Sequence, residues 1–116
     1  MIVTVPLHQD KLRARGYNQS DEIARGLSEA TGIPLVHDVL IRKEMTDTQT
    51  KRKRFERWEN MENKFMLNGQ ISISGLHIIL VDDVITTGAT LEACGSVLLE
   101  VNGVSVSIIS LCFAIN

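Results

Sequence analysis

The sequence has 116 residues, the length of one domain built around one core. Its apolar fraction of 44% is that of a folded domain, and its net charge of −2 gives no sign of a general nucleic-acid binder. Cys94 and Cys112, which we expect to be buried, form no CxxC pair, which excludes a zinc ribbon and a disulfide framework. The apolar runs are too short for a membrane helix, and the first residues lack the basic region of a signal peptide. We therefore expect a cytoplasmic protein with no membrane partner.

The charged residues are unevenly distributed along the chain. All 12 lysines and arginines lie in residues 1–64, whereas residues 65–116 contain four acidic residues and no lysine or arginine. The most basic stretch, residues 51–57, reads Lys-Arg-Lys-Arg-Phe-Glu-Arg. A solvated helix face is the simplest interpretation of such a stretch, and contact with a polyanion is the alternative.

The first part of the chain predicts two strands and one helix. Residues 2–5 form a short apolar strand, and a polar, basic loop follows over residues 6–19. Ser20 is a suitable N-cap for a helix with an apolar stripe, which Gly32 ends. Residues 35–41 form a second apolar run and therefore a second predicted strand.

The second part predicts a loop, two helices and three strands. The loop covers residues 42–53, and a short helical pattern follows up to about residue 63. The strands are predicted at 65–67, 77–81 and 104–113, with a helix at 89–102. Strands that alternate with helices are typical of a parallel sheet with right-handed crossovers, so we expect an α/β fold with a sheet flanked by helices.

Residues 79–91 carry the most informative pattern in the sequence. An apolar strand ends in Asp82 and Asp83, a turn rich in threonine follows, and a helix begins directly after Gly88. Free amides at a helix N-terminus favour an anion, threonine hydroxyls add donors, and glycine lets the backbone approach closely. Carboxylates suit sugar hydroxyls or hydrated Mg²⁺ rather than phosphate. The pattern predicts a phosphorylated sugar, with its phosphate on the turn and its ribose hydroxyls on the aspartate pair.

A purely structural role or a different nucleotide site fits this segment less well. Each residue alone fits a helix capped by threonine after an acidic turn, but the whole 13-residue pattern rarely arises in that way. The sequence has neither GxxxxGK[ST] nor GxGxxG, which disfavours ATP hydrolysis and dinucleotide redox chemistry.

The same segment resembles the 5-phosphoribosyl-1-pyrophosphate (PRPP) signature of type I phosphoribosyltransferases. The resemblance implies a three-layer fold of this family, and it implies that Asp82 and Asp83 are the catalytic acids that hold the ribose hydroxyls. It assigns the phosphate to the residues that follow, namely Val84, Ile85, Thr86, Thr87, Gly88, Ala89 and Thr90. Mg²⁺ is the implied cofactor, bound through PRPP, with the two aspartates as candidate ligands.

A second resemblance, to ComF-like proteins, extends from Val5 to about Ala114. It rests on Val5–His8, Arg13, Arg15–Gln19, Thr48–Thr50, Arg54, Arg57–Asn60 and Phe65. ComF-like proteins are competence-associated homologues of phosphoribosyltransferases and are related to amidophosphoribosyltransferase. The resemblance implies a pyrophosphate side built from His8, Arg13, Arg15, Lys51 and Arg52. It also implies that residues 43–54 form a loop that closes over the site.

ComF-like chains typically begin with a zinc ribbon that this sequence lacks. The sequence also lacks the stretch before the first strand that helps to build the site in the family, so we expect a fold truncated at its N-terminus and a partly open site. We favour an enzyme, a glycosyltransferase that transfers the phosphoribosyl group of PRPP to a nitrogen nucleophile of unknown identity. One alternative is a non-catalytic module in DNA uptake, in which residues 51–54, Phe55 and Trp58 bind single-stranded DNA weakly. Another is a regulator that senses PRPP. A second copy of the chain is a further candidate partner, as a homodimer.

Overall fold

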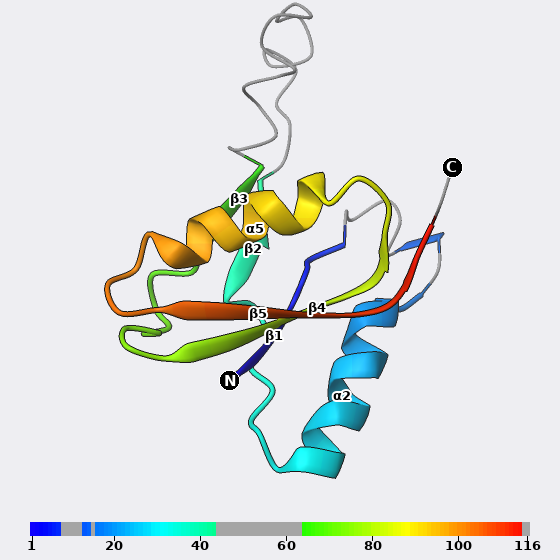
Figure 1. Ribbon diagram of the computed structural model, residues 1–116, viewed down its shortest axis with the longest axis horizontal. Coiled ribbons are helices and arrows are strands. Elements are labelled where there is room, and N and C mark those ends of the chain that lie inside the picture. Colours follow the sequence, from blue (N-terminus) through cyan, green and yellow to red (C-terminus); the bar gives the residue numbers. More distant parts are fainter. Residues whose placement is uncertain (8–12, 15, 44–63, 115–116) are drawn as a thin grey trace, which may run out of the picture.

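Three parallel strands form the central sheet of the computed structural model, which describes residues 1–7, 13, 14, 16–43 and 64–114. The strands are β1 (Ile2–Thr4), β4 (His77–Ile85) and β5 (Ser105–Phe113), in the order β1-β4-β5. Helix α2 (Gln19–Thr31) covers one face of the sheet and helix α5 (Ala89–Leu99) covers the other, which gives the three layers in Figure 1. The expected α/β fold with a parallel sheet between helices is confirmed.

The middle strand, β4, is buried on both faces, as its apolar sequence predicts. Ile78 and Leu80 pack in one core with Cys94 of α5, whereas Val81 packs in a second core with Ala24 of α2. All five side chains are fully buried. Burial of one large aliphatic side chain contributes about 1.5–3 kcal/mol, so these contacts hold the carboxyl end of β4 in a fixed place between the helices.

β4 continues past its predicted end at residue 81. It pairs in parallel with β5 from His77↔Ser105 to Ile85↔Phe113, and this neighbour keeps the chain extended through Ile85. Asp82 and Asp83 therefore lie within the strand, and only residues 86–88 form the turn before α5. The predicted strand end was wrong because pairing with β5 was not visible in the local sequence.

The ends of the two helices differ in part from the prediction. Asn18, rather than Ser20, caps α2, because the Asn18 side chain accepts a hydrogen bond from the backbone N–H of Ser20 at 3.0 Å. The predicted end at Gly32 is confirmed, since this residue has a left-handed φ of 75° and donates its N–H to a carbonyl of the last turn. Helix α5 ends at Leu99 instead of residue 102, and the N–H of Glu100 bonds back to the Val97 carbonyl at 3.3 Å.

The predicted strand at residues 35–41 was wrong in its extent. Leu35 makes a single parallel bridge with Ile2, and the chain then turns at Asp38, whose φ of 62° interrupts an extended strand. The strand β2 (Leu40–Arg42) begins after this turn. It pairs antiparallel with β3 (Phe65–Leu67), outside the parallel sheet.

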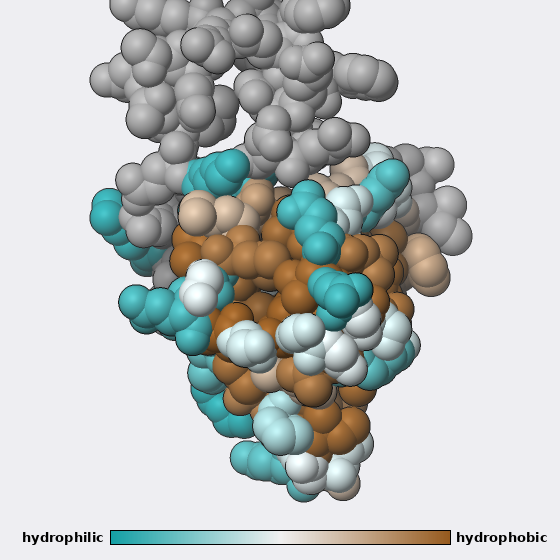
Figure 2. Space-filling view, turned by 90° about the vertical axis from the view of Figure 1, so that its left-hand side faces the viewer, coloured by the Kyte–Doolittle hydropathy of each residue, from teal (hydrophilic) through white to brown (hydrophobic). Residues whose placement is uncertain are grey.

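The last strand, β5, is much more exposed than β4 because it lies at the edge of the sheet. Cys112 is consequently exposed, which corrects the expectation of a buried side chain, whereas Cys94 is buried as expected. Figure 2 shows a broad apolar area on the side of the molecule formed by the end of α5 and the beginnings of β4 and β5. None of the helices in the described ranges is both long and apolar enough to span a membrane.

Candidate functional site

The turn between β4 and α5 forms a small open hollow at the carboxyl end of the sheet. The hollow has a volume of about 30 Å³ and is lined by Asp82, Val84, Ile85, Thr86, Gly88, Ala89, Thr90 and Leu91. Gly88 is the N-cap of α5 and has a φ of 82°, so it brings the backbone round without a side chain that would cover the first amides of the helix. A hollow of this kind, at a helix N-terminus beyond the end of a parallel strand, suits an anion.

The surroundings of Asp82 both stabilise and destabilise its carboxylate. Its Oδ1 accepts hydrogen bonds from the backbone N–H of Asp83 at 2.9 Å and from the hydroxyl of Ser20 at 3.5 Å. Burial raises the pKa of Asp82 above its ordinary value, and the neighbouring side chain of Asp83 raises it further, while the contacts with the Asp83 amide and Ser20 lower it. Burial therefore disfavours the ionised form of Asp82 relative to the same group in water. Such a carboxylate is typical of a site that binds a positively charged or hydrogen-bond-donating ligand.

Asp83 accepts one hydrogen bond through its carboxylate and one through its backbone carbonyl. Its Oδ1 accepts a hydrogen bond from the N–H of Val84 at 2.9 Å, and its carbonyl oxygen accepts one from the hydroxyl of Ser110 at 3.2 Å. The aspartates thus share one arrangement, in which each carboxylate bonds to the amide of the next residue. These two hydrogen bonds orient both carboxylates beside the turn.

A buried thiol connects the site to a cation that the sequence analysis did not single out. Burial and the charge of Asp82 raise the pKa of Cys94 to about 12, and the charge of Arg42 acts in the opposite direction. Asp82 and Arg42 therefore both lie within electrostatic reach of the same side chain. Arg42 also lies over the Phe65 ring, with 5.4 Å from its Cζ atom to the ring centroid. The sequence signal that could have pointed to Arg42 is its place as the single charged residue at the end of the apolar strand β2.

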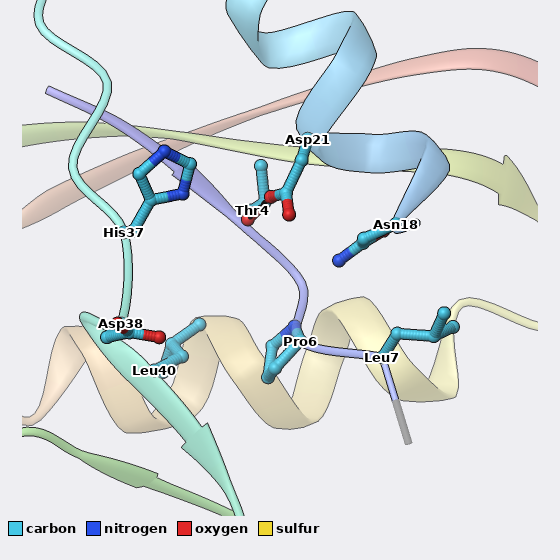
Figure 3. Close-up of a pocket in the computed structure, with 8 residues that line it drawn as sticks. All are labelled: Thr4, Pro6, Leu7, Asn18, Asp21, His37, Asp38 and Leu40. Atoms are coloured by element: carbon cyan, nitrogen blue, oxygen red, sulfur yellow. Dashed lines mark hydrogen bonds between the residues drawn. The ribbon is translucent and has the colours of Figure 1, made fainter. Parts of the chain in front are cut away.

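A larger pocket lies at the carboxyl end of β1, the strand next to β4 in the sheet. Its volume is about 180 Å³, and it is lined by Thr4, Pro6, Leu7, Asn18, Asp21, His37, Asp38 and Leu40 (Figure 3). The hydroxyl of Thr4 donates to Oδ1 of Asp21 at 2.7 Å, and the Asn18 amide donates to the Val5 carbonyl at 3.2 Å. The lining brings together β1, the beginning of α2 and the turn before β2. Sequence reasoning missed this pocket because its residues are far apart along the chain.

The comparison with known families agrees with this geometry. The model of the phosphoribosyl transferase domain matches residues 13–115. The chain belongs to the phosphoribosyltransferase family. Within it, the predicted ComF-like character is confirmed by the relatives described next.

Curated relatives carry names linked to DNA utilization and competence. The chain is 34% identical to "DNA utilization protein YhgH" of Escherichia coli K12 over 111 residues, which are 96% of this chain and 48% of that protein. It is 36% identical to "Competence protein F" of Haemophilus influenzae over 98 residues, 84% of this chain and 43% of that protein. It is 32% identical to "Competence protein ComFC" of Bacillus subtilis over 100 residues, 86% of this chain and 38% of that protein. The chain thus spans about half or less of the length of the curated relatives it matches.

The phosphoribosyltransferase-family domain brings most of the predicted PRPP residues together. Seven of them line one hollow, namely Asp82, Val84, Ile85, Thr86, Gly88, Ala89 and Thr90, and Asp83 lies beside it in the same strand. Thr87 is not part of the lining, and its hydroxyl oxygen accepts a hydrogen bond from the N–H of Ala89 at 3.2 Å. On the predicted pyrophosphate side, only Arg13 is described, and it is exposed. The others, His8, Arg15, Lys51 and Arg52, lie outside the described residues, as does most of the predicted closing loop at 43–54.

The residues at the turn suit an Mg²⁺ ion that binds together with the phosphates of a substrate. They do not suit a metal ion that is held by protein ligands alone. Within the ranges that the structure describes, no group of three or more histidine, cysteine or acidic side chains is placed to hold a metal ion. Asp82 and Asp83 offer hard carboxylate oxygens, and Mg²⁺ typically binds one or two carboxylates together with substrate phosphates and water.

Proposed function

We propose that this domain binds PRPP with Mg²⁺ and transfers the phosphoribosyl group to a nitrogen nucleophile in the cytoplasm. The observation that carries the proposal is the junction of β4 and α5, where Asp82 and Asp83 precede a threonine-rich turn at a helix N-terminus. Membership of the phosphoribosyltransferase family supports the same substrate. The names of the relatives say nothing of the nitrogen acceptor.

In the proposed complex, the 5′-phosphate lies on residues 86–90. Threonine hydroxyls and the amides of Thr90 and Leu91 donate hydrogen bonds to it, because amides in the first turn of a helix have no intrahelical acceptors. The amide of Ala89 donates to the Thr87 hydroxyl instead. The ribose hydroxyls donate to the carboxylates of Asp82 and Asp83, which the following amides already orient. Fixing both ends of the sugar orients its anomeric carbon, and orientation lowers the barrier to transfer.

Transfer exchanges one bond at the anomeric carbon for another. The bond from this carbon to the pyrophosphate oxygen breaks, and pyrophosphate leaves with the electron pair. The nitrogen lone pair forms the new bond, and the nitrogen then loses a proton to solvent. Positive charge develops on the sugar in between, so Asp82 and Asp83 stabilise the transition state electrostatically. Mg²⁺ bound with PRPP supplies positive charge that offsets the charge of the leaving pyrophosphate.

Titration calorimetry with PRPP and MgCl₂ tests the proposal. We expect saturable binding to the wild-type chain, and weaker binding to the double variant Asp82→Asn with Asp83→Asn. Hydrogen bonds to charged groups contribute about 1.5–3 kcal/mol each, so the loss should be at least about tenfold. Glu29→Gln is the matched control, because Glu29 is an exposed acid on α2. Neither heat nor a change in Tm at millimolar PRPP would refute PRPP binding.

A second candidate is a non-catalytic module that binds single-stranded DNA, since relatives carry the names "DNA utilization protein YhgH" and "Competence protein F". The same calorimeter distinguishes the two functions. A DNA-binding module should respond to Lys51→Ala with Arg52→Ala, which would reduce the salt slope of DNA binding by about 1.4 for two lost contacts. Under the transferase proposal, DNA binding is weak, and the aspartate variants rather than the basic ones lower the affinity for PRPP.

A further inference from the structure

The outer edge of β5 has no pairing strand in the described part of the chain. β5 is the last strand in the order β1-β4-β5 and lies at the front of the sheet in Figure 1. Its nine residues, Ser-Val-Ser-Ile-Ile-Ser-Leu-Cys-Phe, include no charge and no proline. Natural proteins usually protect a sheet edge of this length with charges, prolines or a covering segment, because open backbone groups accept another strand. The edge of β5 has none of these protections among the described residues.

The exposed apolar side chains of β5 lie on both faces of the sheet. Ile108 is 50% exposed and is paired with Leu80, which belongs to the core below α5. Ile109 is 36% exposed and is paired with Val81, which belongs to the core on the α2 side. Farther along, Leu111 and Phe113 are more than 70% exposed. A helix laid on one face would cover only part of this set, whereas a strand added to the edge contacts both faces.

The backbone direction of β5 limits how such a strand can pair. The N–H of Ser105 donates to the Leu76 carbonyl at 3.2 Å, so the backbone groups of Ser105 point toward β4. Because backbone groups alternate in direction along a regular strand, those of Val106 and Ile108 point outward. The alternation is interrupted farther along β5, since the N–H of Ala114 also donates to β4, at the Ile85 carbonyl, at 2.9 Å. An added antiparallel strand would exchange hydrogen bonds with these residues.

We propose that the edge of β5 is the interface for a second copy of this chain, paired antiparallel about a two-fold axis at Ile108. The added strand must be apolar on both faces and uncharged, and β5 itself has this composition. A two-fold axis makes the contact self-complementary and closed, so growth stops at the dimer. No charged residue follows Glu100 in the chain, so this pairing sets no like charges opposite one another. The pair would form one continuous sheet across the two copies, parallel within each copy and antiparallel at the junction.

The competing occupant is additional polypeptide, since the relatives are about twice as long as the part that this chain matches. Sedimentation of the whole chain over a wide concentration range separates the two. We expect a monomer–dimer equilibrium, and we expect Ile108→Lys to weaken it at least about tenfold, because a lysine at an edge opposes strand pairing. Leu99→Lys is the matched control: Leu99 is 57% exposed but lies on α5, so its substitution should leave the equilibrium unchanged.

A cross-link tests the register without a charged substitution. In the proposed pairing, Ser107 of one copy faces Ile109 of the other in a non-hydrogen-bonded pair, whose Cα atoms are about 4.5 Å apart and within disulfide reach. Mixing Ser107→Cys and Ile109→Cys chains, each with Cys112→Ser, should give a disulfide-linked heterodimer on mild oxidation. Ser107→Cys mixed with Leu111→Cys is the control and should link poorly. A chain that stays monomeric at all concentrations, that forms open-ended aggregates, or that dimerises equally well with Ile108→Lys overturns the proposal.

Discussion

The hydroxyl of Ser20 lies 3.5 Å from Oδ1 of Asp82, so the beginning of α2 contacts the carboxylate near the end of β4. Ser20 is 3% exposed and is the one buried polar residue in the described ranges. A buried hydroxyl needs a partner, and Asp82 is the acceptor that this fold provides. The contact favours the ionised carboxylate and so opposes the effect of burial on the pKa of Asp82. Ser20 is therefore a positioning residue for Asp82 under the proposed function.

Ser20→Ala should affect both stability and ligand binding. We expect a loss of about 1 kcal/mol in the free energy of unfolding, because a buried acceptor loses its donor. The pKa of Asp82 should rise further, and PRPP should bind more weakly. Chemical denaturation and calorimetry measure the two effects. Ser96→Ala, at an exposed position of α5, is the control, and equal results for both variants would show that the Ser20 contact has no role.

Asp82→Asn should stabilise the fold at neutral pH while it weakens the proposed PRPP binding. Burial raises the pKa of Asp82 above 3.8, so the folded state holds this proton more tightly than the unfolded chain does. The stability that the protonated group contributes is complete below the unfolded pKa and is lost as the pH rises through the folded pKa. Ionised Asp82 therefore lowers the free energy of unfolding at neutral pH, and the uncharged amide of the Asp82→Asn variant removes this penalty.

Thermal unfolding followed from acid to neutral pH checks this sign. The difference in Tm between Asp82→Asn and wild type should grow as the pH rises and should vanish in acid. Glu29→Gln, a matched change at an exposed acid of α2, should show no such trend. A variant that is less stable than wild type at neutral pH would contradict the account of Asp82.

Two glycines in and beside α5 should respond to alanine with opposite signs. Gly88 has a φ of 82°, so Gly88→Ala forces a side chain into a left-handed conformation and should destabilise the fold by about 1–2 kcal/mol. Gly95 lies inside α5, and apart from the adjoining residues and backbone of this helix no heavy atom lies within 4 Å of the place that an alanine Cβ would take. Gly95→Ala should therefore stabilise the fold by up to about 1 kcal/mol. Urea denaturation of both variants measures the difference. Equal changes in the free energy of unfolding for the two variants would argue against a left-handed conformation at Gly88.

The sequence predicted the order of most elements, because apolar runs and helix caps are local signals. It failed at residues 35–41, where the left-handed Asp38 divides one apolar run into a bridge and the strand β2. It also ended β4 too early, since pairing with β5 is a long-range contact. The turn between β4 and α5 was predictable as a contiguous motif. Arg42 and the pocket beside β1 were not, because they depend on segments that come together only in the fold.

The two cysteines should differ sharply in reactivity. Cys94 is buried and its pKa is raised to about 12, so it carries almost no thiolate near neutral pH, whereas Cys112 is exposed. Mass spectrometry after brief treatment with iodoacetamide should therefore find one modified residue in the native chain and two after unfolding. Rapid modification of Cys94 in the native chain would mean that the core under the site opens readily.

The central claim is that the turn between β4 and α5 binds the phosphate of PRPP, and NMR titration tests it most directly. The backbone amides of residues 86–90 are followed while PRPP and Mg²⁺ are added, with the amides of Ser105–Ser107 at the far end of the sheet as the internal reference. We predict large, saturable shifts at residues 86–90, smaller shifts at Asp82 and Asp83, and none at the reference amides. Shifts that are absent from residues 86–90, or that are spread evenly over the sheet, would contradict the claim.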